Sequence, residues 1–238
     1  MNKAPQKRFQ ETIVFVHHFG GGMRTTLRHL RLVNNLGFDA VRFELAFNSF
    51  EARNLLPISA DLKIGARHIW MEQIESVLNA IPGKKILYSF SMPSLGALGA
   101  IANRHANDIT GWVTDGGPFL QLMRASNNLF EHEYHVKNPL LRLAYTGGSY
   151  MMFGWGTEVS VPRWLEELPK GFPVLSIRGG KDPLVPVSAI NAVFNQTDCL
   201  GLEKLFIPDG AHLDGLKKFA SVYEPAVKGF LTKIGTSV

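Results

Sequence analysis

Three residues of the kinds used in nucleophilic catalysis each follow a short apolar stretch of this sequence. They are Ser91, Asp182 and His212. A serine hydroxyl is a poor nucleophile until a base removes its proton. A histidine does this near neutral pH, and a carboxylate holds that histidine in the required tautomer. A fold that brings the three side chains together would therefore equip the chain for acyl-group chemistry on a serine.

Ser91 lies within residues 85–98, where an apolar run precedes a segment with leucines on one helical face. A strand turning sharply into a helix would present Ser91 above the helix N-terminus, where amides and the helix dipole favour negative charge. The alternative is that Ser91 is the N-cap serine of that helix. The local residues leave both interpretations open, and Asp182 and His212, which follow later strands, favour the nucleophile.

Predicted strands and helices alternate along the chain. β-branched and aromatic runs predict strands over residues 12–16, 40–45, 86–88, 109–114, 173–177 and 203–207. Apolar residues at three- and four-residue spacing predict helices over residues 27–36, 66–81, 187–196 and 214–234, besides the one after Ser91. This alternation predicts a parallel α/β sheet covered on both faces, with ligands bound outside the carboxyl ends of the strands.

Residues 119–170 break the alternation and are rich in aromatic residues and methionine. We expect them to form a helical cap inserted into a core made of residues 1–118 and 171–238. Phe119 and Phe153 lie in this segment and are candidate substrate contacts. Packing of the cap onto the core is the alternative role for its aromatic side chains.

The order of the serine, aspartate and histidine along the chain resembles that of the α/β-hydrolase family. The family's nucleophile elbow is Gly-x-Ser-x-Gly, and residues 89–93, Ser-Phe-Ser-Met-Pro, are the corresponding segment. Residues 180–186, Gly-Lys-Asp-Pro-Leu-Val-Pro, are similar to its acid segment, and residues 210–212, Gly-Ala-His, to its histidine segment. Residues 16–21, Val-His-His-Phe-Gly-Gly, resemble its first-strand loop.

This resemblance covers residues 12–118 and 170–235. It implies an α/β-hydrolase fold with a reduced six-stranded parallel sheet in the order 2-1-3-4-5-6, because only a short tail precedes the first strand. It also implies that the backbone N–H groups of Phe19 and Met92 bind an oxyanion. The implied activity is that of a serine esterase or thioesterase that acts on a small-molecule acyl substrate and needs no cofactor and no metal.

Three positions depart from the family's pattern. Ser89 and Pro93 replace the two elbow glycines, and His18 replaces a loop glycine. Serine is small, and proline suits the first turn of a helix, where its missing N–H is not needed. His18 is a candidate substrate contact, since its side chain either crowds the oxyanion loop or adds a hydrogen bond. The altered elbow, which resembles that of luminescence-type acyltransferases, leaves open acyl transfer to an alcohol or amine. A non-catalytic, ligand-binding relative is a third hypothesis.

Several acidic residues and one more histidine have competing interpretations. Asp115 follows the fourth predicted strand and is the alternative acid, because some family members place the carboxylate there. We expect His17 to bond loop backbone. Asp209 and Asp214 flank His212, and we expect both to face solvent.

Composition argues against several other classes. The 238 residues are 45% hydrophobic and 19% charged, enough for one domain with a sizeable core. The net charge is +5, but the basic residues are scattered, which argues against nucleic-acid binding. A single cysteine, Cys199, excludes an intrachain disulfide. No apolar run approaches the roughly 18 residues of a membrane span, and we expect a cytoplasmic protein.

Two short motifs suggest a metal site and a dinucleotide loop. Residues 131–135, Glu-His-Glu-Tyr-His, have no matching second cluster, which argues against a metal site. Residues 20–22 are glycines after a strand, but Thr25 occupies the third glycine position of a dinucleotide-binding loop. Neither reading accounts for the serine, aspartate and histidine at the strand ends.

Overall fold

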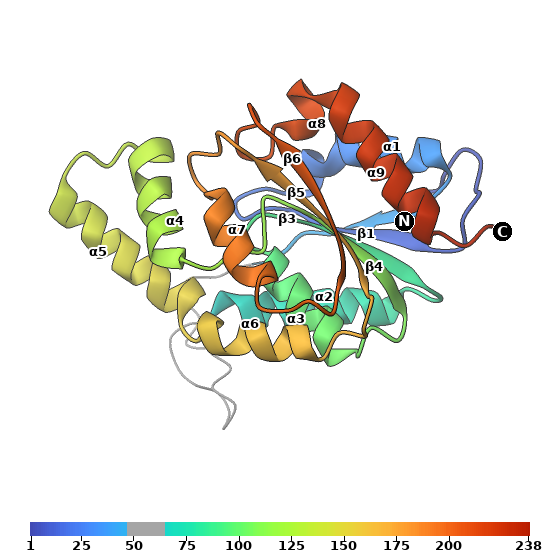
Figure 1. Cartoon of the computed structure of the whole chain (residues 1–238), viewed down its shortest axis with the longest axis horizontal. Coiled ribbons are helices and arrows are strands. Elements are labelled where there is room, and N and C mark those ends of the chain that lie inside the picture. The colour runs from blue at the N-terminus through green and yellow to red at the C-terminus, as the bar shows by residue number, and fades with distance from the viewer. Residues whose placement is uncertain (47–64) are drawn as a thin grey trace.

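The computed structural model, which describes residues 1–46 and 65–238, contains one sheet of six strands (Figure 1). The strands are β1 (Thr12–Val16), β2 (Asp39–Arg42), β3 (Lys85–Phe90), β4 (Ile109–Asp115), β5 (Pro173–Gly179) and β6 (Gly201–Ile207). Their order is β2-β1-β3-β4-β5-β6 and every neighbouring pair is parallel, which confirms the prediction. The order reverses between β1 and β3, so the loops after these strands meet at the crevice where such sheets bind ligands.

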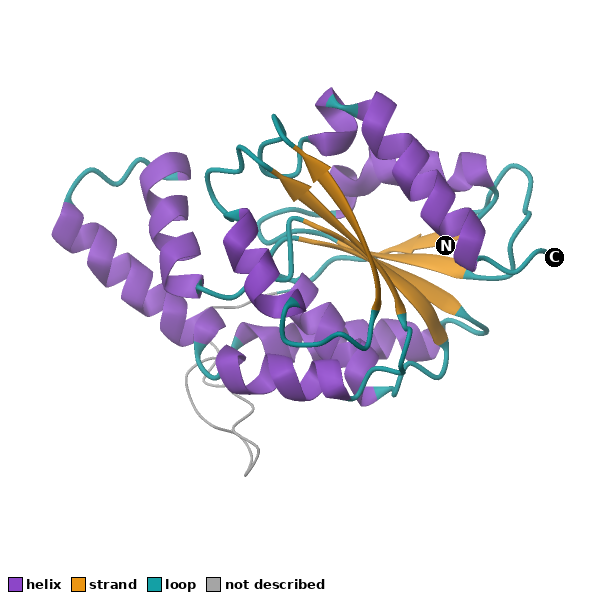
Figure 2. Cartoon of the chain, viewed as in Figure 1, coloured by secondary structure: helices purple, strands orange, loops and turns teal. Residues whose placement is uncertain are grey.

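Helices cover both faces of the sheet (Figure 2). One face carries α1 (Leu27–Leu36), α8 (Gly215–Lys218) and α9 (Ala220–Ile234). The other face carries α2 (Ala66–Ala80), α3 (Ser94–Asn103), α6 (Thr157–Glu166) and α7 (Val187–Phe194). A short 3₁₀ turn, η1 (Met23–Thr26), leads into α1.

Two apolar cores lie on the two faces of the sheet. Successive side chains of a strand point to opposite faces, so Ile13 and Ile86 enter one core while Val14 and Leu87 enter the other. All four are fully buried. Burial on both faces explains why the inner strands are continuously apolar rather than alternating.

Residues 119–170 form α4 (Leu122–Asn128), α5 (Pro139–Ser149) and α6, with π-helical turns η3 (Leu129–Glu133) and η4 (Tyr150–Gly154). α6 packs against α3, where Trp164 lies so close to Gly99 that a Cβ on Gly99 would be 3.1 Å from the indole. α4 and α5 instead project to the left of the sheet in Figure 1. The segment is thus partly a layer of the core and partly a separate helical projection.

The C-terminal helix differs from its prediction. One helix was expected over residues 214–234, but the chain forms α8 and α9 with Phe219 between them at φ −126° and ψ 37°. Phe219 packs against the core on the face of the sheet that carries α1, α8 and α9. This tertiary contact interrupts the helix, although the sequence has a helical period throughout. β6 begins two residues earlier than predicted, α7 ends two residues earlier, and β2 ends at Arg42. None of the helices that the structure describes is long and apolar enough to cross a membrane.

Candidate active site

Ser91 occupies the turn between β3 and α3 in a conformation that few non-glycine residues adopt. Its φ is 55°, in the left-handed region. Its N–H donates to the Asp115 carbonyl oxygen (2.8 Å), and its own carbonyl oxygen accepts from the Ser94 N–H (3.1 Å). The N-cap position belongs to Pro93 and has no side-chain capping bond. Ser91 is therefore not the N-cap of α3, and backbone bonds on both sides hold it in a strained turn.

The two elbow positions without glycine have a physical explanation. Ser89 is fully buried, and its hydroxyl oxygen accepts a hydrogen bond from the Trp112 indole N–H (2.8 Å). A small side chain fits there, and its polar atom has a partner. Pro93 has φ −58°, the value its ring prefers and the helix needs. Both departures are compatible with the strand–turn–helix geometry.

Ser91, His212 and Asp182 are joined by two hydrogen bonds. His212 Nδ1 lies 2.6 Å from Asp182 Oδ2, and His212 Nε2 lies 2.9 Å from Ser91 Oγ. A carboxylate only accepts, so Nδ1 carries the hydrogen and Nε2 has a free electron pair for the Ser91 hydroxyl hydrogen. The three residues predicted at three different strand ends thus form one continuous chain of bonds.

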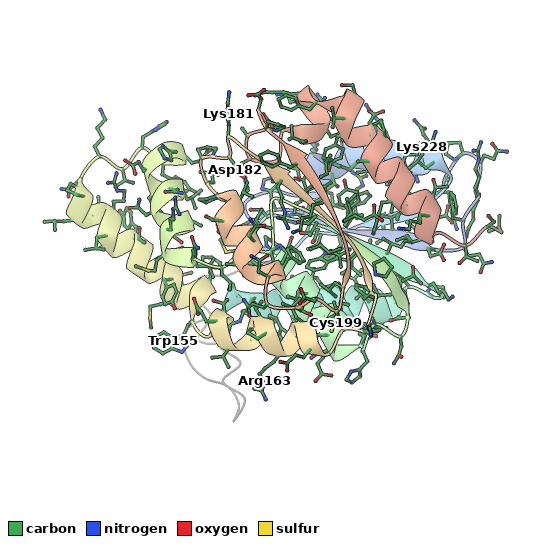
Figure 3. All side chains as sticks on the ribbon, in the orientation of Figure 1. Trp155, Arg163, Lys181, Asp182, Cys199 and Lys228 are labelled. Atoms are coloured by element: carbon green, nitrogen blue, oxygen red, sulfur yellow. The ribbon has the colours of Figure 1, made fainter. Side chains whose placement is uncertain are left out.

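The Asp182 carboxylate is fixed on its other side as well. Its Oδ1 accepts from the backbone N–H groups of Leu184 (2.8 Å) and Val185 (2.9 Å), and its side chain is 3% exposed. Figure 3 shows Asp182 at the end of β5, on the side of the sheet toward α4, whereas the neighbouring Lys181 points outward. With both oxygens occupied, the carboxylate presents Oδ2 to His212 in one orientation.

Close contact between the ends of β5 and β6 brings Asp182 to His212. A Cβ on Gly179 would lie 2.5 Å from the Gly210 carbonyl oxygen, so a larger residue would push the loops apart. The Lys181 N–H donates to the same carbonyl oxygen (2.9 Å). Neither Gly179 nor Gly210 has a positive φ. What they provide is room for two backbones to approach.

Asp214 positions the His212 loop, which corrects the prediction that it faces solvent. Its Oδ1 accepts from the Ala211 N–H (2.8 Å), and its side chain is only 13% exposed. An aspartate that bonds back to loop backbone is common in turns, and its place two residues after the histidine is the signal that sequence reasoning missed. Asp209, by contrast, is 67% exposed and pairs with Lys181, as expected.

His17 bonds loop backbone, as predicted. Its Nδ1 donates to the His18 carbonyl oxygen (2.8 Å), and its Nε2 accepts from the Leu45 N–H (2.9 Å). These two bonds use both nitrogens of a neutral ring, so the nearby Glu44 carboxylate, 3.4 Å from Nε2, does not form an ion pair with it. The bond from Leu45 also explains why β2 ends early, because the chain leaves the sheet to reach His17.

A cavity of about 410 Å³ opens onto Ser91 and His212. Phe19 and Met92, whose backbone N–H groups are the predicted oxyanion donors, both line it, as do the predicted substrate contacts His18 and Phe119. Phe153 lines a second cavity of about 410 Å³. In the described residues, no three His, Cys, Asp or Glu side chains form a group that could hold a metal ion.

Asp115, the alternative acid, takes part in a different set of bonds. Its carboxylate is buried and accepts from the Tyr223 hydroxyl (2.8 Å), which in turn lies 2.5 Å from the Tyr88 hydroxyl. Burial raises the pKa of Asp115 from its ordinary 3.8 to about 6, although the Tyr223 hydrogen bond opposes the shift. His212 is therefore hydrogen-bonded to Asp182, whereas Asp115 is hydrogen-bonded to Tyr223 of α9.

Asp115→Asn is expected to stabilise the protein above pH 6. The folded protein binds the Asp115 proton more tightly than the unfolded chain does, so the free energy of unfolding falls as pH rises from 3.8 to about 6. At higher pH the buried Asp115 carboxylate is charged and destabilises the folded protein. A shift of this size corresponds to about 2–3 kcal/mol, and an asparagine can still accept from Tyr223. Thermal unfolding at pH 7.5 should show a melting temperature a few degrees higher than wild type. A lower melting temperature at pH 7.5 would show that the charge itself is stabilising.

Comparison with known proteins shows the fold. No protein-family model matches the sequence, and no curated protein matches it. A monoacylglycerol lipase of Paleococcus ferrophilus is 15% identical with a TM-score of 0.67, and the match covers 97% of each chain. An esterase of Pyrococcus furiosus is 17% identical with a TM-score of 0.62, over 96% of this chain and 83% of the other. The chain has the α/β-hydrolase fold. A bromoperoxidase of Bacillus anthracis, 14% identical, matches 93% of this chain and 92% of its own with a TM-score of 0.61.

The α/β-hydrolase fold does not by itself decide the reaction, because proteins with different activities share it. It does account for the arrangement of the site. The loops after β3, β5 and β6 carry Ser91, Asp182 and His212, and all three strands end at the same edge of the sheet.

Proposed function

We propose that the protein is a serine hydrolase that cleaves a carboxylic ester or thioester with an apolar acyl group. The observation that carries this proposal is the bonded chain from Ser91 through His212 to Asp182, with Ser91 held in the strained turn of a nucleophile elbow. The α/β-hydrolase fold of structures that include esterases and a lipase supports it.

The proposed reaction has two halves. Ser91 Oγ attacks the acyl carbonyl carbon while its proton moves to His212 Nε2, and Asp182 stabilises the imidazolium that results. The bond from the carbonyl carbon to the leaving oxygen or sulfur then breaks, and His212 gives its proton to the leaving group. Water repeats the sequence on the acyl-enzyme and releases the carboxylic acid. Every proton moves between groups of this chain, the substrate and water, so the reaction needs no cofactor.

The negative charge that develops on the carbonyl oxygen would be held by the backbone N–H groups of Met92 and Phe19. Among the described residues, the Met92 N–H makes no hydrogen bond, and Met92 begins the turn into α3. Amides at a helix N-terminus stabilise an anion at this place. Loss of one such donor typically reduces the rate by about 10²–10³-fold.

The second cavity supports an apolar acyl group. It shares Phe19 and Met92 with the cavity at Ser91, so it begins beside the proposed oxyanion donors. Ser149 also lines it, and the hydroxyl of Ser149 is bonded to that of Ser126 (3.1 Å). The remaining walls are largely aromatic and aliphatic, from Leu129, Phe130, Ala144, Tyr145, Met152 and Phe153. Since α4, α5 and the turns beside them supply these walls, we propose that this part of residues 119–170 forms a cap that selects the acyl group.

A side chain added at Gly148 is expected to shorten the acyl groups that the protein accepts. Gly148 lines the second cavity, and an added Cβ there would meet no atom within 4 Å. Each excluded methylene group forfeits about 0.8 kcal/mol, or roughly fourfold in kcat/KM. Gly148→Phe should therefore lower kcat/KM by about tenfold or more on the longest p-nitrophenyl esters and leave the acetate unchanged.

Gly147→Phe is the matched control. Gly147 is the preceding residue of α5, is equally open, and is not among the described residues that line the cavity. Both variants gain the same helix propensity, so a difference between them reports the cavity alone. Identical chain-length profiles for the two variants and the wild type would argue against an acyl site here. A preference for polar acyl groups in the wild type would overturn the apolar specificity itself.

A further inference from the structure

His18 lies on one side of the reacting centre only. It lines the cavity that holds Ser91 and His212, but it is not among the described residues lining the apolar cavity. The two cavities share Phe19, Met92, Leu129 and Tyr134 in their linings, and the substrate carbonyl would sit beside Phe19 and Met92 in the function proposed above. With the acyl chain in the apolar cavity, the other half of an ester, its alcohol, lies on the side of His18.

The hydrogen bonds of His18 determine which of its nitrogens carries a proton. Its Nδ1 lies 2.9 Å from the Phe19 carbonyl oxygen, which can only accept, so Nδ1 bears the hydrogen. Burial lowers the pKa of the His18 imidazole, and the neighbouring rings of His212 and His17 lower it further, against the effect of the Phe19 bond. The ring is therefore neutral near pH 7, and Nε2 has a free electron pair. No described residue donates to it.

The absence of a side chain on Gly21 makes room for this ring. A Cβ on Gly21 would lie 2.7 Å from Nε2, 2.9 Å from Cε1 and 3.0 Å from Cδ2 of His18. Near-equal distances to three ring atoms place Gly21 over the face of the imidazole rather than at its edge. The electron pair of Nε2 lies in the ring plane, so it is not directed at Gly21. The ring is stacked on the loop with its one unused acceptor free for a ligand.

We propose that His18 Nε2 accepts a hydrogen bond from a hydroxyl group on the alcohol half of the substrate, so that the preferred substrates are esters of polyhydroxy alcohols. The inference rests on the function proposed above and specifies its leaving group. A neutral acceptor fixed beside the reacting carbonyl binds an O–H donor and offers nothing to an ether of the same shape. His18 replaces a glycine of the family's loop, and its side chain makes this contact possible.

The test compares two esters that differ only in the donor. Hydroxyethyl hexanoate and methoxyethyl hexanoate share the acyl group and the first atoms of the alcohol, but only the first has a free hydroxyl. A hydrogen bond between neutral groups is worth about 1 kcal/mol, so the wild type should favour the hydroxy ester by about fivefold in kcat/KM. In His18→Phe, which keeps a planar ring without an acceptor, the ratio should fall to about one. The ratio within each variant cancels any general loss of activity.

Gly21→Ala provides a second test that leaves His18 in place. The added methyl group would displace the imidazole, so the ratio should again fall toward one. A wild-type ratio near one, with normal turnover of p-nitrophenyl hexanoate, would overturn the role of His18 and leave the proposed function standing. A preference for the hydroxy ester that survives both substitutions would also overturn it. No turnover of any ester by the wild type would instead contradict the proposed function.

Discussion

Replacing Ser91 with alanine is expected to lower kcat/KM for p-nitrophenyl hexanoate by about 10⁴–10⁶-fold, to the level left by oxyanion and substrate binding alone. Ser91 Oγ is the atom that His212 Nε2 contacts, and alanine removes it without adding bulk. Alanine also tolerates the left-handed turn no worse than serine does, and the backbone bonds to Asp115 and Ser94 remain. Steady-state kinetics measure the loss, and circular dichroism verifies the fold.

Ser94→Ala is the control for this substitution. Ser94 is a buried serine three residues further along the same turn. Its hydroxyl oxygen accepts a hydrogen bond from the Thr114 hydroxyl (3.1 Å) and does not contact His212. Its loss should change kcat/KM by less than tenfold. If Ser91→Ala retained more than a few per cent of wild-type turnover, Ser91 would not be the nucleophile.

Asp182→Asn is expected to lower kcat by about 10⁴-fold with little change in KM. Asparagine has nearly the same shape as aspartate. Where its side-chain N–H₂ faces His212, that group donates to Nδ1, so the imidazole hydrogen has to be on Nε2. The imidazole then faces Ser91 with an N–H in place of an electron pair and cannot take the serine proton. The loss should appear in the acylation step, which single-turnover kinetics with an activated ester can isolate.

The alternative acid provides the comparison. Asp115 is also a buried carboxylate at a strand end, but Tyr223 rather than His212 is its hydrogen-bond partner. Asp115→Asn should therefore change kcat by less than tenfold. If Asp115→Asn caused the large loss and Asp182→Asn the small one, the assignment of the acid would be reversed.

The sheet could be predicted because its strands have a simple signature. Parallel strands buried on both faces are continuous apolar runs. The topological order then placed the loops after β1 and β3 side by side. The candidate triad could be predicted from the residue types, since Ser91, Asp182 and His212 each lie in a loop after a strand, at the same edge of the sheet.

The parts that sequence reasoning missed depend on contacts between distant segments. The period of residues 214–234 is helical throughout, and only the packing of Phe219 breaks it. The sequence predicted a solvent-facing Asp214, whereas its carboxylate accepts a hydrogen bond from the Ala211 N–H. Whether Ser89 fits at the elbow depended on the indole of Trp112, which lies on the neighbouring strand. Such contacts have no local signal.

His18 shows where a departure from a family's pattern becomes informative. The sequence alone left two effects open, crowding of the loop or an added hydrogen bond. The stacking of its ring over Gly21 and the bond from Nδ1 to Phe19 favour the second, because the ring is accommodated and one acceptor stays free. A substitution at a glycine position can therefore mark specificity rather than loss of function.

The most direct measurement of the central claim is the site of covalent modification by a fluorophosphonate probe. The probe reacts with a serine only when a base activates it, so the intact mass and the modified peptide report the nucleophile without knowledge of the substrate. We expect one adduct per chain, on Ser91, with no adduct in Ser91→Ala. An adduct on another residue, or no labelling of the wild-type protein, would contradict an activated serine at this position.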